Sequence, residues 1–330
     1  MAKISDVARR AGVSTATVSR ALNGKPSVDP ELVDRVRAVA RELGYRPNAL
    51  ARGLRRQETS VLALIISDVE NPFFTSVARG VEDVARVAGY SVVLCNSDED
   101  VTRERRYVEV ALQEQVAGLL LSPTSAASDL SALVDQRVPL VAVDRPLADG
   151  GADTVLVDSR LAARTATQHL VEAGYSRIAC VTGPNGSWTA EARVAGYREA
   201  LDAAGRPFRP ELVHWSDFRI AGGRRAVAGL LATTDRPDAL LVANNLMAVG
   251  ALRALGEAGL RTGVDVGLVA FDDAPWTTLV APALTVVAQP AYEVGAAAAR
   301  LLLGRIGGQA GEPVTVELAA SLLVRGSSVR

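Results

Sequence analysis

The sequence predicts an α/β protein with two parts: an all-helical N-terminal head and a longer body in which strands and helices alternate. The chain has 330 residues and a net charge of −1. This charge is unevenly distributed, because residues 1–57 hold twelve basic and five acidic side chains, a net charge of +7, whereas residues 58–330 carry −8. A short basic block ahead of a mildly acidic body predicts a head that binds a polyanion.

Residues 4–22 have the pattern of two short helices separated by a turn. Ser5 is the expected N-cap of the first helix, Gly12 ends that helix, and Ser14 caps the second helix, over residues 15–22. The apolar residues at helical spacing, which would face inward, are Val7, Ala8, Ala11, Val18 and Leu22.

A third helix follows the sequence Asp29-Pro30-Glu31, which supplies an N-cap, a first-turn proline and an acid that complements the helix dipole. This helix would end at Gly44, and its inward residues would be Leu32, Val36, Val39 and Leu43. Two helices joined by a short turn and braced by a third form a helix-turn-helix. The alternative, an ordinary small helical bundle, would leave the charge of the head without a role.

The body alternates apolar runs with amphipathic stretches. The expected strands are 61–67, 91–96, 118–122, 139–143, 154–157, 177–182, 239–243 and 266–271, with a further strand in LVHWSD (212–217). Wholly apolar strands separated by helices indicate parallel sheets that are covered on both faces. A body of roughly 270 residues exceeds one comfortable core, so two doubly wound lobes are predicted.

The head resembles a known DNA-binding domain along its whole length. The segments ISDVARRAGVSTATVSRALNG (4–24) and VDPELVDRVRAVARELGYRPNALARGLR (28–55) are similar, without a gap, to the head of the lactose-repressor/galactose-repressor (LacI/GalR) family. The resemblance implies a transcriptional regulator that binds a palindromic operator in double-stranded DNA as a homodimer. It assigns residues 1–46 to the helix-turn-helix domain and residues 47–60 to a hinge helix and linker.

The second helix is then the recognition helix, whose N-terminal residues point toward base edges in the major groove. Thr15 and Ala16 offer groups suited to thymine, and Arg20, one turn further on, is the best direct reader because arginine binds guanine through two hydrogen bonds. A phosphate contact is the alternative role of Arg20. The residues expected to hold phosphates, which fix register without reading sequence, are Ser14, Thr17, Ser19, Asn23 and Lys25.

Ala49–Leu54 can make fewer than two turns of helix, which is marginal on its own. In the family this segment is the hinge helix, which folds on DNA against its dimer mate. The resemblance makes Leu54 the wedge that enters the minor groove, where an apolar side chain unstacks a base step and kinks the duplex. Arg52 and Arg55 flank it and are expected to contact the DNA backbone or the minor groove.

The resemblance extends over the body, which is similar to the two-lobed periplasmic-binding-protein-like (type 1) α/β effector domain of the same family. The segments that carry it are DVENPFF (68–74), VDSRLAARTATQHLVEAGYSRIACVTGP (157–184), EARVAGYREAL (191–201), ALLVANNLMAVGAL (239–252), VGLVAFDD (266–273), PALTVVAQP (282–290) and LLVRGSS (322–328). In that fold the chain crosses between the lobes three times. The effector-binding and dimerisation domain would span 61–330, with one lobe at about 61–157 and 290–318 and the other at about 158–289 and 319–330.

Polar and aromatic side chains follow several expected strands, at the sheet edge where ligands of such folds bind. Asp, Asn and Arg side chains have two adjacent polar atoms that can hydrogen-bond vicinal hydroxyls, and aromatic rings can cover the C–H face of a sugar ring. A sugar is therefore the expected small-molecule effector. A nucleobase or nucleoside, or a protein corepressor, is the alternative. By residue-wise resemblance the effector contacts are Phe73, Phe74, Thr189, Arg193, Phe218, Asn244, Asp272 and Gln289, with Asp158, Trp188 and Trp276 as weaker candidates. Two positions depart from the family pattern, because Ala162 and Asn245 stand where Gly and Asp are more usual.

Other function classes fit the sequence poorly. No glycine-rich phosphate loop and no nucleophile elbow is present, so catalysis is not expected. His169 and His214 are expected to be structural. Cys95 and Cys180 lie in apolar runs that predict buried thiols, and the chain has too few Cys and His residues for a structural zinc site, so no cofactor or metal is expected.

The expected cellular location rests on the N-terminus and on the longest uncharged run of the sequence. The N-terminus has no apolar core of signal-peptide length, and the longest uncharged run contains three prolines, which is unlike a membrane span. We therefore expect a cytoplasmic protein with no membrane partner. A solute-binding protein for transport would need export and would leave the basic head unexplained.

Overall fold

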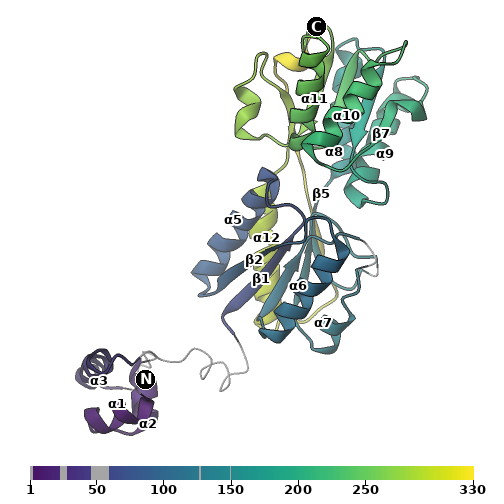
Figure 1. Ribbon diagram of the computed structural model, residues 1–330. Helices are drawn as coiled ribbons and strands as arrows, with labels where there is room; N and C mark the ends of the chain where they lie inside the picture. Colours follow the sequence, from purple (N-terminus) through teal and green to yellow (C-terminus); the bar gives the residue numbers. More distant parts are fainter. Residues whose placement is uncertain (1–2, 23–27, 46–58, 126–127, 149) are drawn as a thin grey trace. The chain divides into compact units, whose positions relative to one another are not determined.

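The computed structural model describes residues 3–22, 28–45, 59–125, 128–148 and 150–330. The chain divides into two compact units, Met1–Thr59 and Ser60–Arg330, which are the head and the body (Figure 1). In the described part of the head there are three helices, α1 (Ile4–Ala11), α2 (Thr15–Leu22) and α3 (Pro30–Glu42). Val7, Val18 and Val36, one from each helix, are wholly buried and pack in a common core.

Two of the three expected helix caps are confirmed. The backbone N–H of Thr17 donates to Ser14 Oγ at 3.1 Å, which caps α2. The N–H of Glu31 donates to Asp29 Oδ1 at 2.8 Å, which caps α3.

The expected cap at Ser5 is wrong. Helix α1 begins one residue earlier, at Ile4, with Lys3 in the N-cap position. Asp6 accepts the backbone N–H of Lys3 at 2.9 Å, so an acid in the first turn replaces the serine cap. The expected inward residue Leu22 is only half-buried, and Ala21 takes the wholly buried position beside it.

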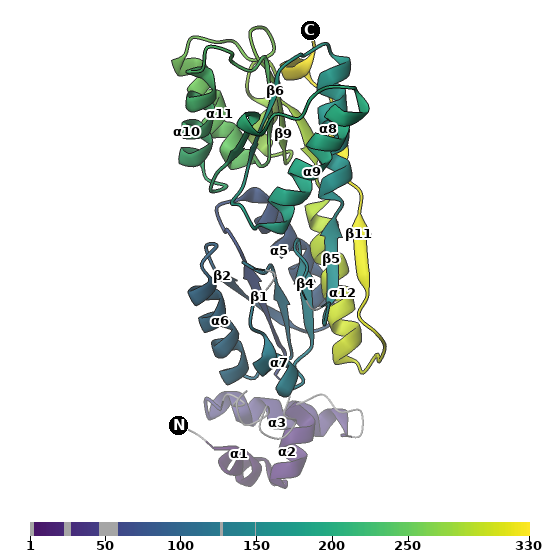
Figure 2. The same ribbon diagram turned by 90° about the vertical axis from the view of Figure 1, so that its right-hand side faces the viewer.

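The body contains two six-stranded sheets. The first has the order β11-β5-β4-β3-β1-β2 and is parallel throughout. The second has the order β12-β10-β9-β8-β6-β7 and is parallel except for the β10–β12 pair. We call the sheets with their helices the first lobe and the second lobe; Figure 2 shows both.

The first lobe consists of β1 (Val61–Ile66), α5 (Pro72–Val87), β2 (Ser91–Asn96), α6 (Val101–Gln113), β3 (Gly118–Leu121), α7 (Ser131–Asp135), β4 (Leu140–Val143), β5 (Asp153–Val157), α12 (Ala291–Ile306) and β11 (Thr315–Leu318). The second lobe consists of α8 (Ser159–Glu172), β6 (Ile178–Thr182), α9 (Trp188–Ala203), η1 (Pro210–Leu212), β7 (Val213–Trp215), α10 (Ile220–Leu231), β8 (Ala239–Val242), α11 (Asn245–Glu257), β9 (Gly267–Phe271), η2 (Pro275–Thr278), β10 (Thr285–Ala288), β12 (Ser321–Leu323) and η3 (Gly326–Ser328). The chain crosses between the sheets three times, after β5, β10 and β11.

Each central strand serves two cores, because successive side chains point to opposite faces of a sheet. In β1, Leu62 and Leu64 pack with α5 and α12, whereas Ala63 and Ile65 pack on the side of α6 and α7. This two-sided burial explains why the strand is apolar at every position.

Edge strand β2 departs from this pattern. None of its six residues is fully buried, and Cys95 is only half-buried. The prediction of a buried thiol is therefore wrong for Cys95, which lies on a strand paired along one side alone. It is confirmed for Cys180 in β6, where burial raises the thiol pKa to about 12.

Candidate functional site

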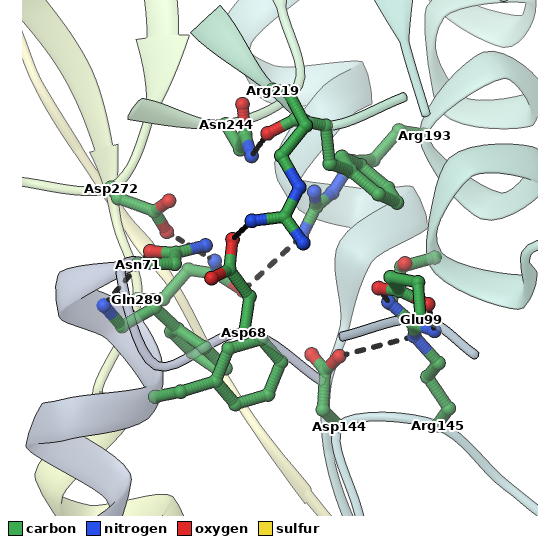
Figure 3. Close-up of a pocket in the computed structure, with 14 residues that line it drawn as sticks. Asp68, Asn71, Glu99, Asp144, Arg145, Arg193, Arg219, Asn244, Asp272 and Gln289 are labelled. Carbon is green, nitrogen blue, oxygen red and sulfur yellow. Dashed lines mark hydrogen bonds and ion pairs between the residues drawn. The ribbon is translucent and has the colours of Figure 1, made fainter. Parts of the chain in front are cut away.

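A pocket lies between the two lobes, at the carboxyl ends of their strands (Figure 3). Its lining residues are Asp68, Asn71, Phe73, Phe74, Glu99, Asp144, Arg145, Thr189, Arg193, Phe218, Arg219, Asn244, Asp272 and Gln289. All eight of the main effector contacts expected from the sequence are among them. The six residues that sequence reasoning missed are Asp68, Asn71, Glu99, Asp144, Arg145 and Arg219.

The three weaker candidates do not line this pocket. Asp158 caps α8 by accepting the N–H of Leu161 at 2.8 Å. Trp276 packs against the core of the second lobe, and Trp188 is the half-buried first residue of α9.

Arg193 of α9 is the central cation of the second-lobe wall. Its side chain is buried, and its guanidinium lies 4.1 Å from the centroid of the Phe271 ring and donates to the carbonyl of Ala243. It also donates to Gln289 Oε1 at 3.5 Å, and Gln289 Nε2 donates to Asp272 Oδ1 at 2.6 Å. Burial lowers the pKa of Arg193, while the nearby carboxylates of Asp272 and Asp144 oppose that shift.

Asn245 supports the same wall, although it does not line the pocket. Its Nδ2 donates to Asp272 Oδ2 at 2.8 Å and to Asn71 Oδ1, in the first lobe, at 2.7 Å. An aspartate at this position would place a carboxylate against two other oxygens. The departure from the family pattern therefore has a local reason, because the amide is the form that can donate to both.

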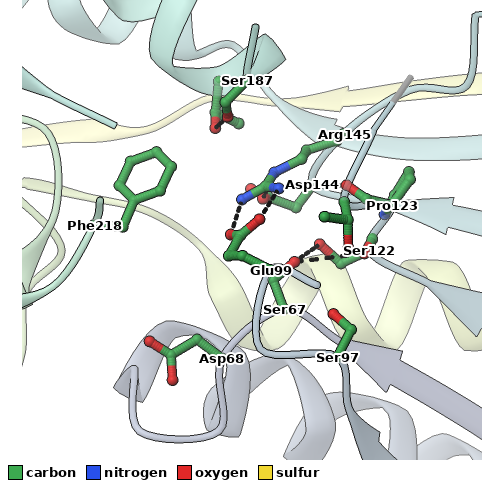
Figure 4. Close-up of polar contacts among 12 residues, drawn as sticks. Ser67, Asp68, Ser97, Glu99, Ser122, Pro123, Asp144, Arg145, Ser187 and Phe218 are labelled. Atoms are coloured by element: carbon green, nitrogen blue, oxygen red, sulfur yellow. Dashed lines mark hydrogen bonds and ion pairs between the residues drawn. The ribbon is translucent and has the colours of Figure 1, made fainter. Parts of the chain in front are cut away.

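Arg145 is the corresponding buried cation of the first-lobe wall (Figure 4). It pairs with Glu99 through two hydrogen bonds, at 2.7 and 2.5 Å, and its Nε is 3.5 Å from Asp144 Oδ2. Burial alone would lower the pKa of Arg145, but Glu99 and Asp144 hold it above its ordinary value. Burial raises the pKa of Asp144, against the attraction of Arg145 and Arg193.

The aromatic side chains are held by polar contacts of their neighbours. The N–H of Phe73 donates to Asn71 Oδ1 at 3.0 Å, which caps α5, and the Phe73 and Phe74 rings meet edge to face at 5.1 Å. The carbonyl of Phe218 accepts from Asn244 Nδ2 at 2.8 Å. A Cβ atom on Gly183 would lie 2.0 Å from the Phe218 ring, so a glycine is required at that position.

Strained backbone is concentrated at this pocket. Seven non-glycine residues of the described chain have positive φ, and four of them line the pocket, namely Glu99, Asp144, Phe218 and Asp272. A left-handed conformation is unfavourable for a bulky residue such as phenylalanine and costs about 1–3 kcal/mol. Strain of this kind persists where the surrounding structure holds it, and in proteins it clusters at functional sites.

The sequence held a signal for several of the missed residues. Asp144 and Arg145 directly follow the strand expected at 139–143, and Asp68 and Asn71 lie within DVENPFF. Asn244 and Asp272 likewise directly follow the strands expected at 239–243 and 266–271. Arg219 had no such signal, since its role depends on partners in the other lobe.

In the head, α2 presents the proposed base-reading residues on its surface. Thr15, Ala16 and Arg20 are exposed, and Arg20 Nε donates to the carbonyl of Ala16 at 3.4 Å. Among the proposed phosphate contacts, Ser14 is exposed and Thr17 and Ser19 are half-buried. The other DNA contacts expected from the sequence, which are Asn23, Lys25, Arg52, Leu54 and Arg55, lie outside the described residues.

The described residues contain no cluster of three His, Cys, Asp or Glu side chains that could hold a metal ion. Among the helices in the described part of the chain, none is long and apolar enough to cross a membrane.

Two family models match the chain. The one described as bacterial regulatory proteins of the lacI family matches residues 3–48, and a periplasmic binding protein-like domain matches residues 167–328. The ribose operon repressor of Escherichia coli (strain K12) is 37% identical over 330 residues, which cover 99% of this chain and 100% of that protein. The chain belongs to the lacI family.

Solved structures agree with this assignment. This lacI-family chain is similar over 100% of its length, and 99% of the other chain, to a crystal structure of the lac repressor dimer bound to operator and the anti-inducer ONPF, with a TM-score of 0.89 and 28% identity. A lacI-family transcriptional regulator from Enterococcus faecium with bound ribose matches over 82% of this chain and 98% of that one, with a TM-score of 0.73 and 28% identity. The expected family and fold class are confirmed, and the chain is a DNA-binding transcriptional regulator with a small-molecule effector.

Proposed function

We propose that this lacI-family chain is a repressor of carbohydrate-utilisation genes, that it binds a palindromic operator as a homodimer, and that its effector is a sugar, with ribose as the first candidate. The observation that carries the proposal is the pocket between the lobes. It combines aromatic rings with paired charged groups. Ribose is the first candidate because the ribose operon repressor of Escherichia coli (strain K12) matches 99% of this chain.

The charge balance of the pocket suits an uncharged, polyhydroxylated ring. Three arginines and four carboxylates line it, and most of them pair with one another. Paired groups keep spare donors and acceptors in fixed directions, and vicinal hydroxyls can use both kinds. The rings of Phe73, Phe74 and Phe218 offer apolar faces for the C–H groups of the sugar.

The head supplies DNA affinity and part of the specificity. Its charge of +7 provides the salt-dependent attraction to phosphates. Thr15, Ala16 and Arg20 are proposed to read bases from the exposed face of α2, while Leu54, between Arg52 and Arg55, is proposed to enter the minor groove. Such a protein acts in the cytoplasm, where its operator lies, and as a regulator rather than as an enzyme.

The two sites are proposed to be coupled through the hinge. Effector binding would reorient the lobes and shift the hinge segment between ordered and disordered states. Linkage then requires that the effector and the operator change each other's affinity by the same factor. An effector that raises operator affinity is a corepressor, and an effector that lowers it is an inducer.

Calorimetry with the purified full-length protein tests the effector. Ribose is compared with a hexose panel, with nucleosides and with purine bases, and operator binding is then measured by fluorescence anisotropy with and without each ligand that binds. We expect ribose to bind and to change operator affinity. Binding of purines and of no sugar would contradict the sugar proposal, and unchanged operator affinity with every bound ligand would contradict the coupling.

A further inference from the structure

One arginine joins the two lobes at the pocket. Arg219 directly follows Phe218 in the second lobe, and its Nη1 lies 2.8 Å from Asp68 Oδ2, after β1 of the first lobe (Figure 3). Its Nη2 donates to the carboxylate of Asp98, after β2 of the same lobe. A single guanidinium therefore connects the second lobe to two carboxylates of the first. We call these three residues the clasp.

The clasp lies at the rim of the pocket. The side chain of Asp68 is 8% exposed, that of Arg219 is 29% exposed, and that of Asp98 is 39% exposed. Asp68 and Arg219 line the pocket, whereas Asp98 does not. Exposure thus rises along the clasp from the pocket interior to the protein surface.

Each lobe holds its part of the clasp in place. In the second lobe the backbone N–H of Arg219 donates to Asp217 Oδ1 at 2.9 Å. In the first lobe Asp98 has a positive φ of 57° and accepts from Arg103 Nη1 at 3.0 Å. Because Arg103 holds the Asp98 carboxylate independently of Arg219, that carboxylate loses little side-chain entropy when it pairs with Arg219.

The pocket behind the clasp is narrow. The space open to the centres of water molecules is about 30 Å³, enough for about two of them. A sugar ring is larger, so its entry or exit requires lining groups to move. The clasp joins both lobes, lines the pocket through Asp68 and Arg219, and reaches the surface at Asp98.

We propose that Arg219 gates effector exchange, and that the ion pairs of the clasp must open before a sugar ring enters or leaves. The identity of the ring rests on the proposed function; the clasp itself does not. Arg219 is a positioning residue that acts through lobe closure. Both of its ion pairs are to protein carboxylates of the first lobe, so their loss speeds entry and exit alike. Since the pairs are partly exposed, salt also weakens them.

The first test requires no sugar. Hydrogen exchange of the full-length protein is compared between the wild type, Arg219→Gln and the control Arg224→Gln. Arg224 lies on α10, and its ion pair with Glu257 stays within the second lobe and is more than half exposed. We expect segments 68–71, 97–100 and 216–222 to exchange about three- to tenfold faster in Arg219→Gln alone. Unchanged exchange in all three segments would overturn the clasp.

The second test follows ribose binding by tryptophan fluorescence in stopped flow. Arg219→Gln is expected to raise the association and dissociation rate constants together, each about three- to tenfold. Wild-type rates should rise between about 0.05 and 0.5 M NaCl although the sugar is uncharged, and the variant should lose that salt dependence. Arg219→Lys keeps the charge but not the paired N–H groups of the guanidinium. Its rate constants should therefore lie between those of the wild type and those of Arg219→Gln.

The outcomes separate the two proposals. A rise in dissociation alone, with an equal loss of affinity, would make Arg219 a direct effector contact and overturn the gate. Faster exchange in the three segments together with no ribose binding by the wild type would support the clasp and refute ribose as the effector.

Discussion

In the recognition helix α2 the proposed DNA-reading side chains stand on an exposed face, whereas in the pocket the proposed effector contacts are buried and hold one another. Thr15, Ala16 and Arg20 are exposed, and the one contact described above for Arg20 is to its own helix. Arg193, in contrast, is buried and contacts residues that follow β8 and β10. The reading surface is therefore a local property of one helix, while the pocket is assembled from distant parts of the chain.

The two regions also differ in backbone conformation. The reading residues belong to a regular helix, but Phe218 and Asp272 have φ of 58° and 74°. A substitution on the helix face should thus change DNA binding with little effect on folding. A substitution in the pocket should change both effector binding and the stability of the body, because each side chain there also supports its neighbours.

Arg193→Ala should have the largest effect. It removes a buried cation that Asp272 and Asp144 both attract, so ribose affinity should fall by about 100-fold, or roughly 3 kcal/mol. Operator affinity without sugar should be unchanged. Calorimetry measures the loss, and Arg198→Ala, an exposed arginine of the same helix, is the control. A loss below about fivefold would place the effector elsewhere.

Arg20→Ala should weaken operator binding by about 1–3 kcal/mol and relax preference at one base pair. The melting temperature should stay within error, because the side chain is exposed. Anisotropy titrations with operator and with unrelated DNA separate base reading from charge, and Arg35→Ala removes an equal charge from α3. Equal losses on both DNAs would assign Arg20 to a phosphate.

Asp144→Asn should stabilise the body at pH 7 while weakening ribose binding. Burial raises the pKa of this carboxyl, so its ionised form disfavours the folded state, and asparagine tolerates the φ of 68°. The gain should shrink as pH falls through the raised pKa and vanish below the ordinary value near 4. Urea unfolding at several pH values measures it. A gain that persists at low pH would contradict the electrostatic cause.

Asp29→Ala should have the smallest effect. It removes the cap of α3 and should destabilise the head by about 0.5–1 kcal/mol. The body should unfold as before, because the two units have separate cores. Calorimetric melting of the full-length protein measures both transitions, with Asp29→Asn, which can still cap, as the control. A matching shift in the body would show that the units unfold together.

Local signals explain which parts of the fold were predictable. Ser14 and Asp29 cap helices in the head because capping depends on residues two or three positions away. Apolar strands such as β1 and β8 were clear because both of their faces are buried. Strands β10, β11 and β12 were missed. Each has only three or four residues, and in the edge strands β11 and β12 exposed and half-buried positions alternate. Such a short run carries little periodicity.

The sequence by itself determined the basic head, the position of its recognition helix, the apolar strands and the strand-end residues that line the pocket. These follow from charge, helical spacing and the rule that parallel strands place their carboxyl ends together. Only the tertiary structure decided how the charges pair. Arg145 with Glu99, and Arg219 with Asp68 and Asp98, are partners 46, 151 and 121 residues apart. No sequence spacing specifies such pairs. The Arg145–Glu99 pair depends on how strands are ordered within one sheet, and the two pairs of Arg219 depend on how two sheets bring their ends together.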